Sequence, residues 1–308
     1  MKIEAIYVAC YKYDLRYTRI LIASIRQWYP DIPILLIKDR LYGDFSTTEI
    51  EHHWNASLLK TEGGPFGWGF SKLEPLFLPE RQRCLILDSD IVFAGPVLPM
   101  VEACDSDVVV QHEDPAPAFV ESHYFHLPSL QQLDPDFHFP GFTFNTGQIV
   151  ATTGVLRRED FAPFVKPGYP ITVIRPDIFK LGEQGLLNYV LMKKAQCGEL
   201  SLSRARFMEV PESPDGHAFG VQLDRLNENS SYRFLIHWCG LKKHRIREMN
   251  RGDILLHFER LYYDAITFGT LRKWSRIART DTEDLLRVLA RKAALRNWWK
   301  TPRKENAS

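Results

Sequence analysis

The sequence predicts an α/β fold, in which a largely parallel sheet is covered by helices on both faces. Two observations lead to this prediction. Residues 3–39 read as strand, helix and strand, a succession that favours parallel strands joined by a right-handed crossover. The strand segments are also almost wholly apolar, which is typical of strands buried on both faces.

The first β-α-β unit can be justified element by element. Residues 3–10 (IEAIYVAC) form an apolar strand, and residues 15–29 carry apolar side chains at helical spacing up to Pro30. Residues 32–39 (IPILLIKD) form the second buried strand. No G-x-G-x-x-G motif follows the first strand, so the dinucleotide-binding fingerprint is absent.

The middle of the chain adds strands and loops. Residues 61–70 (TEGGPFGWGF) contain four glycines and predict a mobile loop, and residues 71–78 a short helix. Residues 83–87 (RCLIL) and 107–111 read as strands. Residues 112–140 hold five of the 19 prolines and four of the ten histidines without periodicity. We therefore expect a long surface loop over a site there.

The last part of the chain changes character near residue 246. Residues 142–152 alternate like a strand, residues 182–194 fit a helix, and residues 231–245 read as a strand that runs into a basic turn. Helical stretches dominate afterwards. We therefore expect two domains, an α/β domain over residues 1–245 and a helical, basic extension over residues 246–308.

Composition excludes several classes of protein. A formal net charge of +1 provides no general attraction for nucleic acid, so no nucleic-acid partner is expected. The five cysteines are scattered without a C-x-x-C pair, which favours reduced thiols in the cytoplasm. No apolar run approaches the roughly 18 residues of a membrane-spanning helix. The N-terminal apolar stretch contains Glu4 and ends at Lys12, so it makes a poor signal peptide.

The C-terminal residues 271–308 contain eleven Lys or Arg and four Asp or Glu, a local excess of seven positive charges. Two interpretations stay open: a solvated helical face, or a peripheral membrane contact worth about 1 kcal/mol per basic residue on anionic lipid. Trp298 and Trp299 favour the membrane surface. Arg291 and Lys292 interrupt the apolar stripe and count against it.

Three D-x-D motifs occur, where composition alone would produce roughly one, so the motif by itself carries little information. Asp88 and Asp90 directly follow the buried strand at residues 83–87. The second motif, residues 105–107, precedes a strand, and the third, residues 134–136, lies in the proline-rich segment. Ligands of open α/β sheets bind beyond the carboxyl ends of strands, so only Asp88 and Asp90 are placed for chemistry. A simple turn is the alternative.

Two carboxylates favour a hard cation, Mg²⁺ or Mn²⁺, over zinc, and such ions often share their ligand shell with substrate phosphates. An imidazole as third ligand would favour Mn²⁺. His237 is the candidate, because it ends an apolar strand and is followed by a glycine and two lysines. A hydrogen-bonded core histidine is the alternative.

Four segments, SKLEPLFL…LDSD, FNTGQIV, EQGLLN and HWCGLKK, resemble glycosyltransferase family 8 in order and spacing. These are retaining enzymes that include glycogenin and bacterial lipopolysaccharide sugar transferases. The resemblance covers about residues 3–245 and leaves out the tail. It implies the GT-A fold, a Rossmann-like mixed sheet flanked by helices that binds a nucleotide-diphospho-sugar.

The resemblance implies roles for individual residues. Asp88, Asp90 and His237 match the ligands of the family's Mn²⁺ (or Mg²⁺). Gly240 and Lys243 match the positions that hold the donor diphosphate, and Lys72 matches a lysine that reaches the nucleotide-sugar. The remaining donor-binding candidates are Ala9 and Tyr13 beside the nucleotide base, Ser89 between the two acids, and Asn188.

Three residues are the candidates for the reacting sugar. Asn145 matches the asparagine of the family's F-N-[TSA]-G motif, and Glu183 and Gln184 match the start of its D-Q-x-x-L-N motif. Glu183 replaces the usual aspartate, and Lys243 is followed by His-Arg where the family commonly has Pro-Trp. A covalent nucleophile is not assigned.

The expected function is a metal-dependent retaining glycosyltransferase that moves a hexose from a UDP-sugar to a carbohydrate or lipid-linked acceptor. A nucleotidyltransferase of sugar-nucleotide metabolism is one alternative, although a glycine-rich phosphate loop is missing after the first strand. A non-catalytic sugar-nucleotide-binding relative is the other. Intact Asp88, Asp90 and His237 argue against it.

Overall fold

The computed structural model describes residues 1–60, 69–211, 216–227, 229–240 and 245–278. The chain divides into two compact units, Met1–Glu259 and Arg260–Ser308, with the boundary inside helix α7 (Gly252–Asp264). The division into residues 1–245 and 246–308 stays a prediction. Within the described residues, none of the helices is long and apolar enough to cross a membrane.

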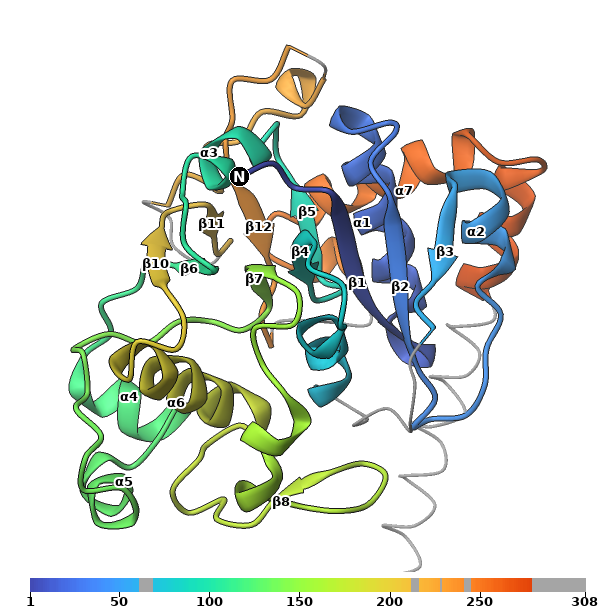
Figure 1. Ribbon diagram of the computed structural model, residues 1–308. Helices are drawn as coiled ribbons and strands as arrows, with labels where there is room; N and C mark the ends of the chain where they lie inside the picture. The colour runs from blue at the N-terminus through green and yellow to red at the C-terminus, as the bar shows by residue number, and fades with distance from the viewer. Residues whose placement is uncertain (61–68, 212–215, 228, 241–244, 279–308) are drawn as a thin grey trace, which may run out of the picture. The chain divides into compact units, whose positions relative to one another are not determined.

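A seven-stranded sheet forms the centre of the first unit (Figure 1). Its strands are β1 (Ala5–Tyr11), β2 (Ile34–Asp39), β3 (Ala56–Leu58), β4 (Arg83–Leu87), β6 (Val108–Gln111), β7 (Gln148–Thr152) and β10 (Leu202–Ala205). They lie in the order β10-β6-β7-β4-β1-β2-β3. Strand β7 runs antiparallel to β4 and β6, whereas the other neighbouring pairs are parallel. The predicted mixed α/β sheet is confirmed.

A second sheet of three strands brings distant parts of the chain together. It contains β5 (Ile91–Phe93), β11 (Met208–Glu209) and β12 (Leu235–His237), in the order β11-β12-β5. Strand β12 runs antiparallel to β5 with His237 opposite Ile91. The Trp238 amide extends this pairing, since it donates to the Asp90 carbonyl at 3.0 Å. His237 is therefore held next to the end of the D-x-D motif.

Helices cover both faces of the large sheet (Figure 1). Those before α7 are α1 (Leu15–Trp28), α2 (Thr48–Trp54), α3 (Leu98–Glu102), α4 (Pro117–His123), α5 (Leu127–Leu133) and α6 (Glu183–Gln196). The 3₁₀-helices are η1 (Lys12–Asp14), η2 (Phe70–Phe77), η3 (Arg158–Asp160), η4 (Ala162–Phe164), η5 (Leu223–Arg225) and η6 (Ile246–Glu248). A small hairpin consists of β8 (Val165–Lys166) and β9 (Thr172–Val173).

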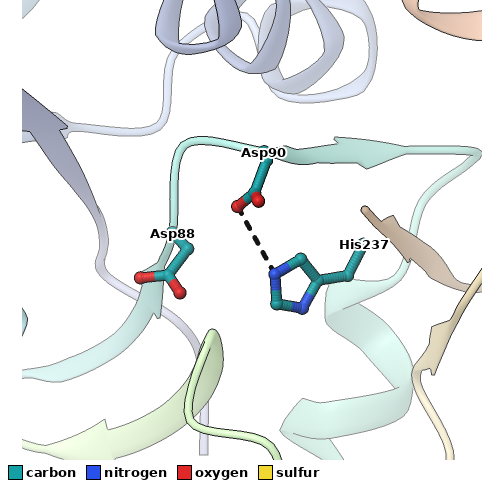
Figure 2. Close-up of side chains that lie close together, drawn as sticks. All are labelled: Asp88, Asp90 and His237. Atoms are coloured by element: carbon teal, nitrogen blue, oxygen red, sulfur yellow. Dashed lines mark ion pairs between the residues drawn. The ribbon is translucent and has the colours of Figure 1, made fainter. Parts of the chain in front are cut away.

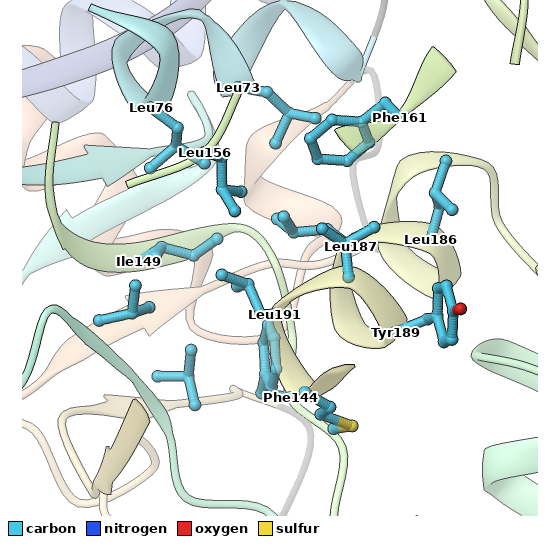
Figure 3. Packing of buried hydrophobic residues seen from close by; sticks show 14 of the residues in the cluster. Leu73, Leu76, Phe144, Ile149, Leu156, Phe161, Leu186, Leu187, Tyr189 and Leu191 are labelled. Atoms are coloured by element: carbon cyan, nitrogen blue, oxygen red, sulfur yellow. The ribbon is translucent and has the colours of Figure 1, made fainter. Parts of the chain in front are cut away.

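The main hydrophobic core lies between the sheet and α6 (Figure 3). Residues 185–192 of α6 are all buried, so the helix presents apolar groups around most of its circumference, as buried helices do. Its leucines pack against η2, β7 and the segment that follows β7. The labelled side chains of this core are Leu73, Leu76, Phe144, Ile149, Leu156, Phe161, Leu186, Leu187, Tyr189 and Leu191. This packing fixes the first turn of α6 near the carboxyl ends of β1 and β4.

Several local predictions were wrong. Residues 112–140 are not a surface loop, because α4 and α5 form there and Phe125, Leu130 and Phe137 are buried in the core. Only residues 148–152 of the expected strand at 142–152 are extended in the sheet, and only 235–237 of the one at 231–245. The short helix expected at 71–78 is confirmed as the 3₁₀-helix η2, one residue earlier at each end. The expected mobile loop at residues 61–70 lies outside the described residues except for its last two.

Candidate active site

A cavity of about 320 Å³ lies at the carboxyl ends of β1, β2 and β4, where an open α/β sheet binds its ligands. Ten of the thirteen site residues predicted from the sequence line it. Tyr13 and Asn188 do not, and Lys243 lies outside the described residues. The lining residues are Ala9, Cys10, Tyr11, Asp14, Asp39, Gly69, Ser71, Lys72, Asp88, Ser89, Asp90, Asn145, Thr146, Leu181, Glu183, Gln184, His237, Cys239 and Gly240.

Asp88, Asp90 and His237 lie together in this cavity, each with one ligand atom within 4.8 Å of those of the other two (Figure 2). His237 Nε2 is 3.4 Å from Asp90 Oδ1, and both side chains are buried. Two ligands on opposite sides of an ion at about 2.1 Å would be roughly 4.2 Å apart, so small shifts would bring the three into coordination. Two carboxylates and one imidazole are a donor set that fits Mn²⁺ or Mg²⁺.

The position of His237 depends on Gly147. A Cβ atom on Gly147 would overlap the His237 ring and come within 2.9 Å of its Nδ1. Nδ1 is itself buried and makes no hydrogen bond within the described chain. The missing side chain of Gly147 thus leaves the space that the imidazole occupies beside Asp90.

Lys72 connects the acidic motif to α6. Its Nζ lies 3.1 Å from Asp88 Oδ2 and 3.2 Å from Glu183 Oε1, and the side chain is buried. Burial disfavours the charged ammonium, but the two carboxylates outweigh it and the pKa of Lys72 is raised. Lys72 therefore stays a cation that holds Asp88 and Glu183 on either side of it.

Asn145 is placed by a network rather than by strand structure. Its Oδ1 accepts the Gly147 amide at 2.7 Å, and the Gly147 carbonyl accepts the Asp88 amide at 2.7 Å. Asn188 is fully buried and bonds the backbone of Phe144 through both its Oδ1 and Nδ2, each at 2.9 Å. Asn188 thus has no contact surface for a donor, which corrects the sequence expectation, and instead positions the segment that carries Asn145.

Of the remaining donor-binding candidates, some line the cavity and one does not. Ala9 and Ser89 line the cavity, and Ser89 Oγ donates to Asp14 Oδ2 at 2.9 Å. Gly240 lines it with φ +70°, a conformation that favours glycine. Tyr13 is exposed and packs on Tyr42 with the ring centroids 5.0 Å apart. It lies outside the cavity lining, contrary to expectation.

Sequence reasoning missed two buried acids in the cavity, Asp14 and Asp39. Asp39 Oδ1 accepts the Leu41 amide at 2.8 Å and the Tyr169 hydroxyl at 2.9 Å. Its Oδ2 is buried with no hydrogen-bond partner within the described residues. Asp39 is the last residue of a buried parallel strand, so the rule that selects Asp88 could have selected it too.

The other two D-x-D motifs lie in structural settings. Asp107 Oδ2 accepts the Ser201 amide at 2.9 Å and its hydroxyl at 2.7 Å, and these bonds lower the pKa of Asp107. Asp105 is exposed. Asp134 bonds the Tyr189 hydroxyl at 2.8 Å and Lys193 at 2.9 Å. Neither motif contributes to a metal-type cluster within the described part of the chain.

Comparison with known proteins adds information at the level of the fold. No family model matches the sequence, and no curated protein matches it. The galactosyltransferase LgtC, in complex with donor and acceptor sugar analogues, is similar in structure with a TM-score of 0.54 and 16% identity. The match covers 85% of this chain and 96% of LgtC.

Two further glycosyltransferases are similar over part of their length. The apo form of the bifunctional glycosyltransferase WbbM has a TM-score of 0.53 and 14% identity, over 85% of this chain. GlyE of Streptococcus pneumoniae TIGR4 has a TM-score of 0.52 and 13% identity, over 90% of this chain. The match spans 50% of the WbbM chain and 64% of the GlyE chain. The chain has the GT-A glycosyltransferase fold.

Proposed function

We propose that the chain is a metal-dependent retaining glycosyltransferase of family 8 that moves a hexose from a UDP-sugar to a carbohydrate or lipid-linked acceptor. One observation carries the proposal: the cluster of Asp88, Asp90 and His237 shares a cavity with Lys72 and Glu183 on a GT-A fold. LgtC, which has the same fold, binds donor and acceptor sugar analogues. Membership of family 8 rests on the sequence motifs.

Asp88, Asp90 and His237 would hold Mn²⁺ or Mg²⁺ in this enzyme. The bound cation supplies a Lewis acid for the negative charge that builds on the departing diphosphate. Lys72 keeps Asp88 oriented through its contact at 3.1 Å. At Gly240 the absence of a side chain lets the backbone approach phosphate oxygens, which adds preorganised dipoles near the leaving group.

The amides of Gln184 and Asn145 line the cavity, and we place them beside the transferred sugar. A transferred sugar becomes oxocarbenium-like as its glycosidic bond breaks, and neutral amide oxygens can stabilise that charge without trapping it. Asn145 Oδ1 already accepts the Gly147 amide, so the NH₂ group is the part of that side chain best suited to hydrogen-bond sugar hydroxyls. Retention of configuration comes to this chain from the resemblance alone.

Asp39 favours a donor whose base carries a ring N–H. Its buried Oδ2 is an acceptor without a partner among the described residues, at the end of the cavity formed by β1 and β2. Uracil has such an N–H next to two carbonyl groups, whereas cytosine lacks it. A buried carboxylate oxygen without a hydrogen bond costs free energy, and the uracil N–H can supply that bond while cytosine cannot. UDP should therefore bind better than CDP.

The experiment that tests the proposal is thermal denaturation with nucleotides, with and without Mn²⁺. At a ligand concentration about 100 times Kd, binding stabilises the protein by about 2.7 kcal/mol, which is several degrees in melting temperature. UDP or a UDP-sugar should raise the melting temperature in Mn²⁺, and UDP more than CDP. Absence of a shift with every UDP compound would contradict the proposal.

Variants at two aspartates locate the metal site. Asp90→Asn should abolish the Mn²⁺-dependent shift, because it removes a charged ligand from a buried cluster. Asp105→Asn is the matched control, since Asp105 is exposed and lies outside the cavity. Equal loss in both variants would contradict the choice of Asp88-Ser89-Asp90.

The products distinguish the alternatives. A glycosyltransferase releases UDP from a UDP-sugar. A nucleotidyltransferase releases pyrophosphate from a nucleoside triphosphate and a sugar phosphate. A non-catalytic relative would bind UDP but would release no UDP from UDP-sugars, even after hours of incubation with a panel of acceptors.

We also propose that the second unit contacts an anionic membrane surface. Phe268, Leu271 and Trp274 are exposed on residues 268–274, interleaved with Arg272 and Lys273. Exposed aromatic and apolar groups beside basic residues suit the interface of an anionic bilayer. Co-sedimentation with phosphatidylcholine vesicles that contain about 30% anionic phosphatidylglycerol should decrease when Leu271 and Trp274 are both changed to serine. Unchanged sedimentation would contradict this contact.

A further inference from the structure

Helix α4 ends directly against the first turn of α6, beside the cavity. The Tyr124 carbonyl accepts the Lys180 amide at 2.8 Å and lies so close to Gly185 that a Cβ atom there would overlap it. The next contact is made by a cavity residue, because Gln184 Nε2 donates to the His123 carbonyl at 3.4 Å. The end of α4 is therefore fixed next to the amide that we place beside the reacting sugar.

An aromatic pair lies on this end of α4. The rings of Phe119 and His123, one turn apart, are stacked with centroids 4.0 Å apart and an interplanar angle of 10°. Phe119 is 46% exposed, although burial of a phenylalanine side chain normally stabilises a protein. Tyr124 packs against the Phe119 ring at 6.1 Å and supports it from the protein side. The pair thus places a partly exposed aromatic ring at the surface, held by His123 and Tyr124.

A carboxylate connects this surface to the cavity by a second route. The Tyr124 hydroxyl donates to Glu113 Oε2 at 3.1 Å. Burial raises the pKa of Glu113, against the opposing effects of the Tyr124 hydroxyl, the Asn145 backbone amide and the charge of His237. Glu113 therefore lies between Tyr124, which supports the aromatic pair, and Asn145, which lines the cavity.

We propose that the Phe119–His123 pair, with Glu113 and Gln184, is the subsite for a pyranose ring of the acceptor. This assignment rests on the proposed function. A pyranose has a face of C–H groups that packs on an aromatic ring, and hydroxyls at its rim that need polar partners. The site offers both: a stacked aromatic surface, and a carboxylate and an amide beside it. An ordinary ligand site combines an apolar surface with a few convergent polar groups in this way.

The location is also appropriate for an acceptor. Asp88, Asp90 and His237 would hold the metal at the diphosphate end of the donor, and Gln184 and Asn145, which line the same cavity, are the residues that we place beside the sugar. A ring resting on Phe119 would approach the transferred sugar past Gln184. The subsite therefore selects a pyranose over a linear hydroxyl compound such as serine or glycerol.

Binding of defined sugars to the full chain loaded with UDP and Mn²⁺ tests the subsite. The probes are methyl and octyl β-D-glucopyranoside and β-D-galactopyranoside, with lactose, maltose and glycerol, measured by saturation-transfer NMR and titration calorimetry. At least one pyranoside should bind, and Phe119→Ala should weaken it about tenfold or more, which is about 1.4 kcal/mol. Phe119→Tyr should retain binding. Tighter binding of octyl than methyl glycosides would point to a lipid-linked acceptor, and equal binding to a free carbohydrate.

Phe219→Ala is the matched control, because Phe219 is 51% exposed, much like Phe119, and is not one of the residues that line the cavity. It should bind the pyranoside like the unaltered chain. Equal binding by Phe119→Ala, or no binding of any pyranoside while UDP still raises the melting temperature, would overturn the subsite. Failure of UDP to raise the melting temperature would count against the proposed function instead, so the two failures are distinct.

Discussion

Replacing Lys72 by methionine tests whether one ammonium group holds the two halves of the candidate site together. Lys72 Nζ lies 3.1 Å from Asp88 Oδ2 and 3.2 Å from Glu183 Oε1, and the side chain is 4% exposed. Methionine fills nearly the same space without a charge. The substitution therefore leaves two carboxylates facing each other without their cation, and the main loss is electrostatic.

The loss in the free energy of unfolding for Lys72→Met can be worked from the burial of the three side chains. Removing one partner of a buried ion pair costs about 3–5 kcal/mol. Asp88 is 30% exposed and Glu183 is 13% exposed, so water screens the remaining charges and we take the lower end, about 3 kcal/mol. For a chain of this length each kcal/mol lowers the melting temperature by about 2 °C, so Lys72→Met should melt roughly 6 °C lower in metal-free buffer.

The control is Lys194→Met, because Lys194 also bridges two carboxylates, Asp160 at 3.0 Å and Glu199 at 2.7 Å. Its side chain is 19% exposed, against 4% for Lys72, and its partner Glu199 is 56% exposed, so water screens this bridge more and its loss should cost less, about 1 kcal/mol. Mn²⁺ should then raise the melting temperature of Lys72→Met more than that of the unaltered chain, since a positive charge next to the ligand Asp88 is gone. The reasoning is refuted if the two variants melt within about 2 °C of each other, or if Mn²⁺ has no larger effect on Lys72→Met.

Two further variants examine the surroundings of the site. Gly147→Ala should lower the free energy of unfolding by about 1–3 kcal/mol and weaken Mn²⁺ binding, because the new methyl group overlaps the His237 ring. Melting curves with and without Mn²⁺ measure both effects. Gly220→Ala is the control and should change neither, because a Cβ atom there meets its neighbours at ordinary packing distances. Glu113→Gln should become more stable relative to the unaltered chain as pH rises from 4 to 7. Burial raises the Glu113 pKa above its ordinary 4.5, so the folded chain binds more protons than the unfolded chain and loses stability as pH rises through that range. A difference in melting temperature that is constant with pH would contradict the burial argument.

The elements that carry the site were predictable because they are apolar runs ending in polar residues. Strands β1, β2 and β4 lie within a residue or two of the expected segments, and their parallel pairing brings their ends to one edge. Asp88 and Asp90 could be selected from three similar motifs on that basis alone. His237 could be named as a candidate ligand because it ends an apolar strand, but its choice among ten histidines depended mainly on the resemblance. Its position beside Asp90 is set by the pairing of β12 with β5, which are three residues each.

The remaining differences have physical causes. Helices α4 and α5 contain prolines at their first turns, where proline is tolerated, and the same prolines suggested a loop in the sequence. Asn188 looks like a ligand contact in a motif, but its position on α6 buries it completely, and its amide bonds the backbone of Phe144 and the Gln184 carbonyl instead. Burial of a single polar side chain is set by tertiary packing, which local pattern does not reveal.

The four segments that resemble one family are joined in space by contacts of one residue each. Lys72 of the first segment bonds Asp88 and also Glu183 of the third. Gly147 of the second accepts the Asp88 amide through its carbonyl and leaves room for His237 of the fourth. A change in any one segment therefore displaces a charged group in another. Each of these contacts lies at or near the metal-type cluster, so the four motifs, weak singly, are the parts of one site. Gly147, two residues after Asn145, is required there because any side chain would overlap the His237 ring.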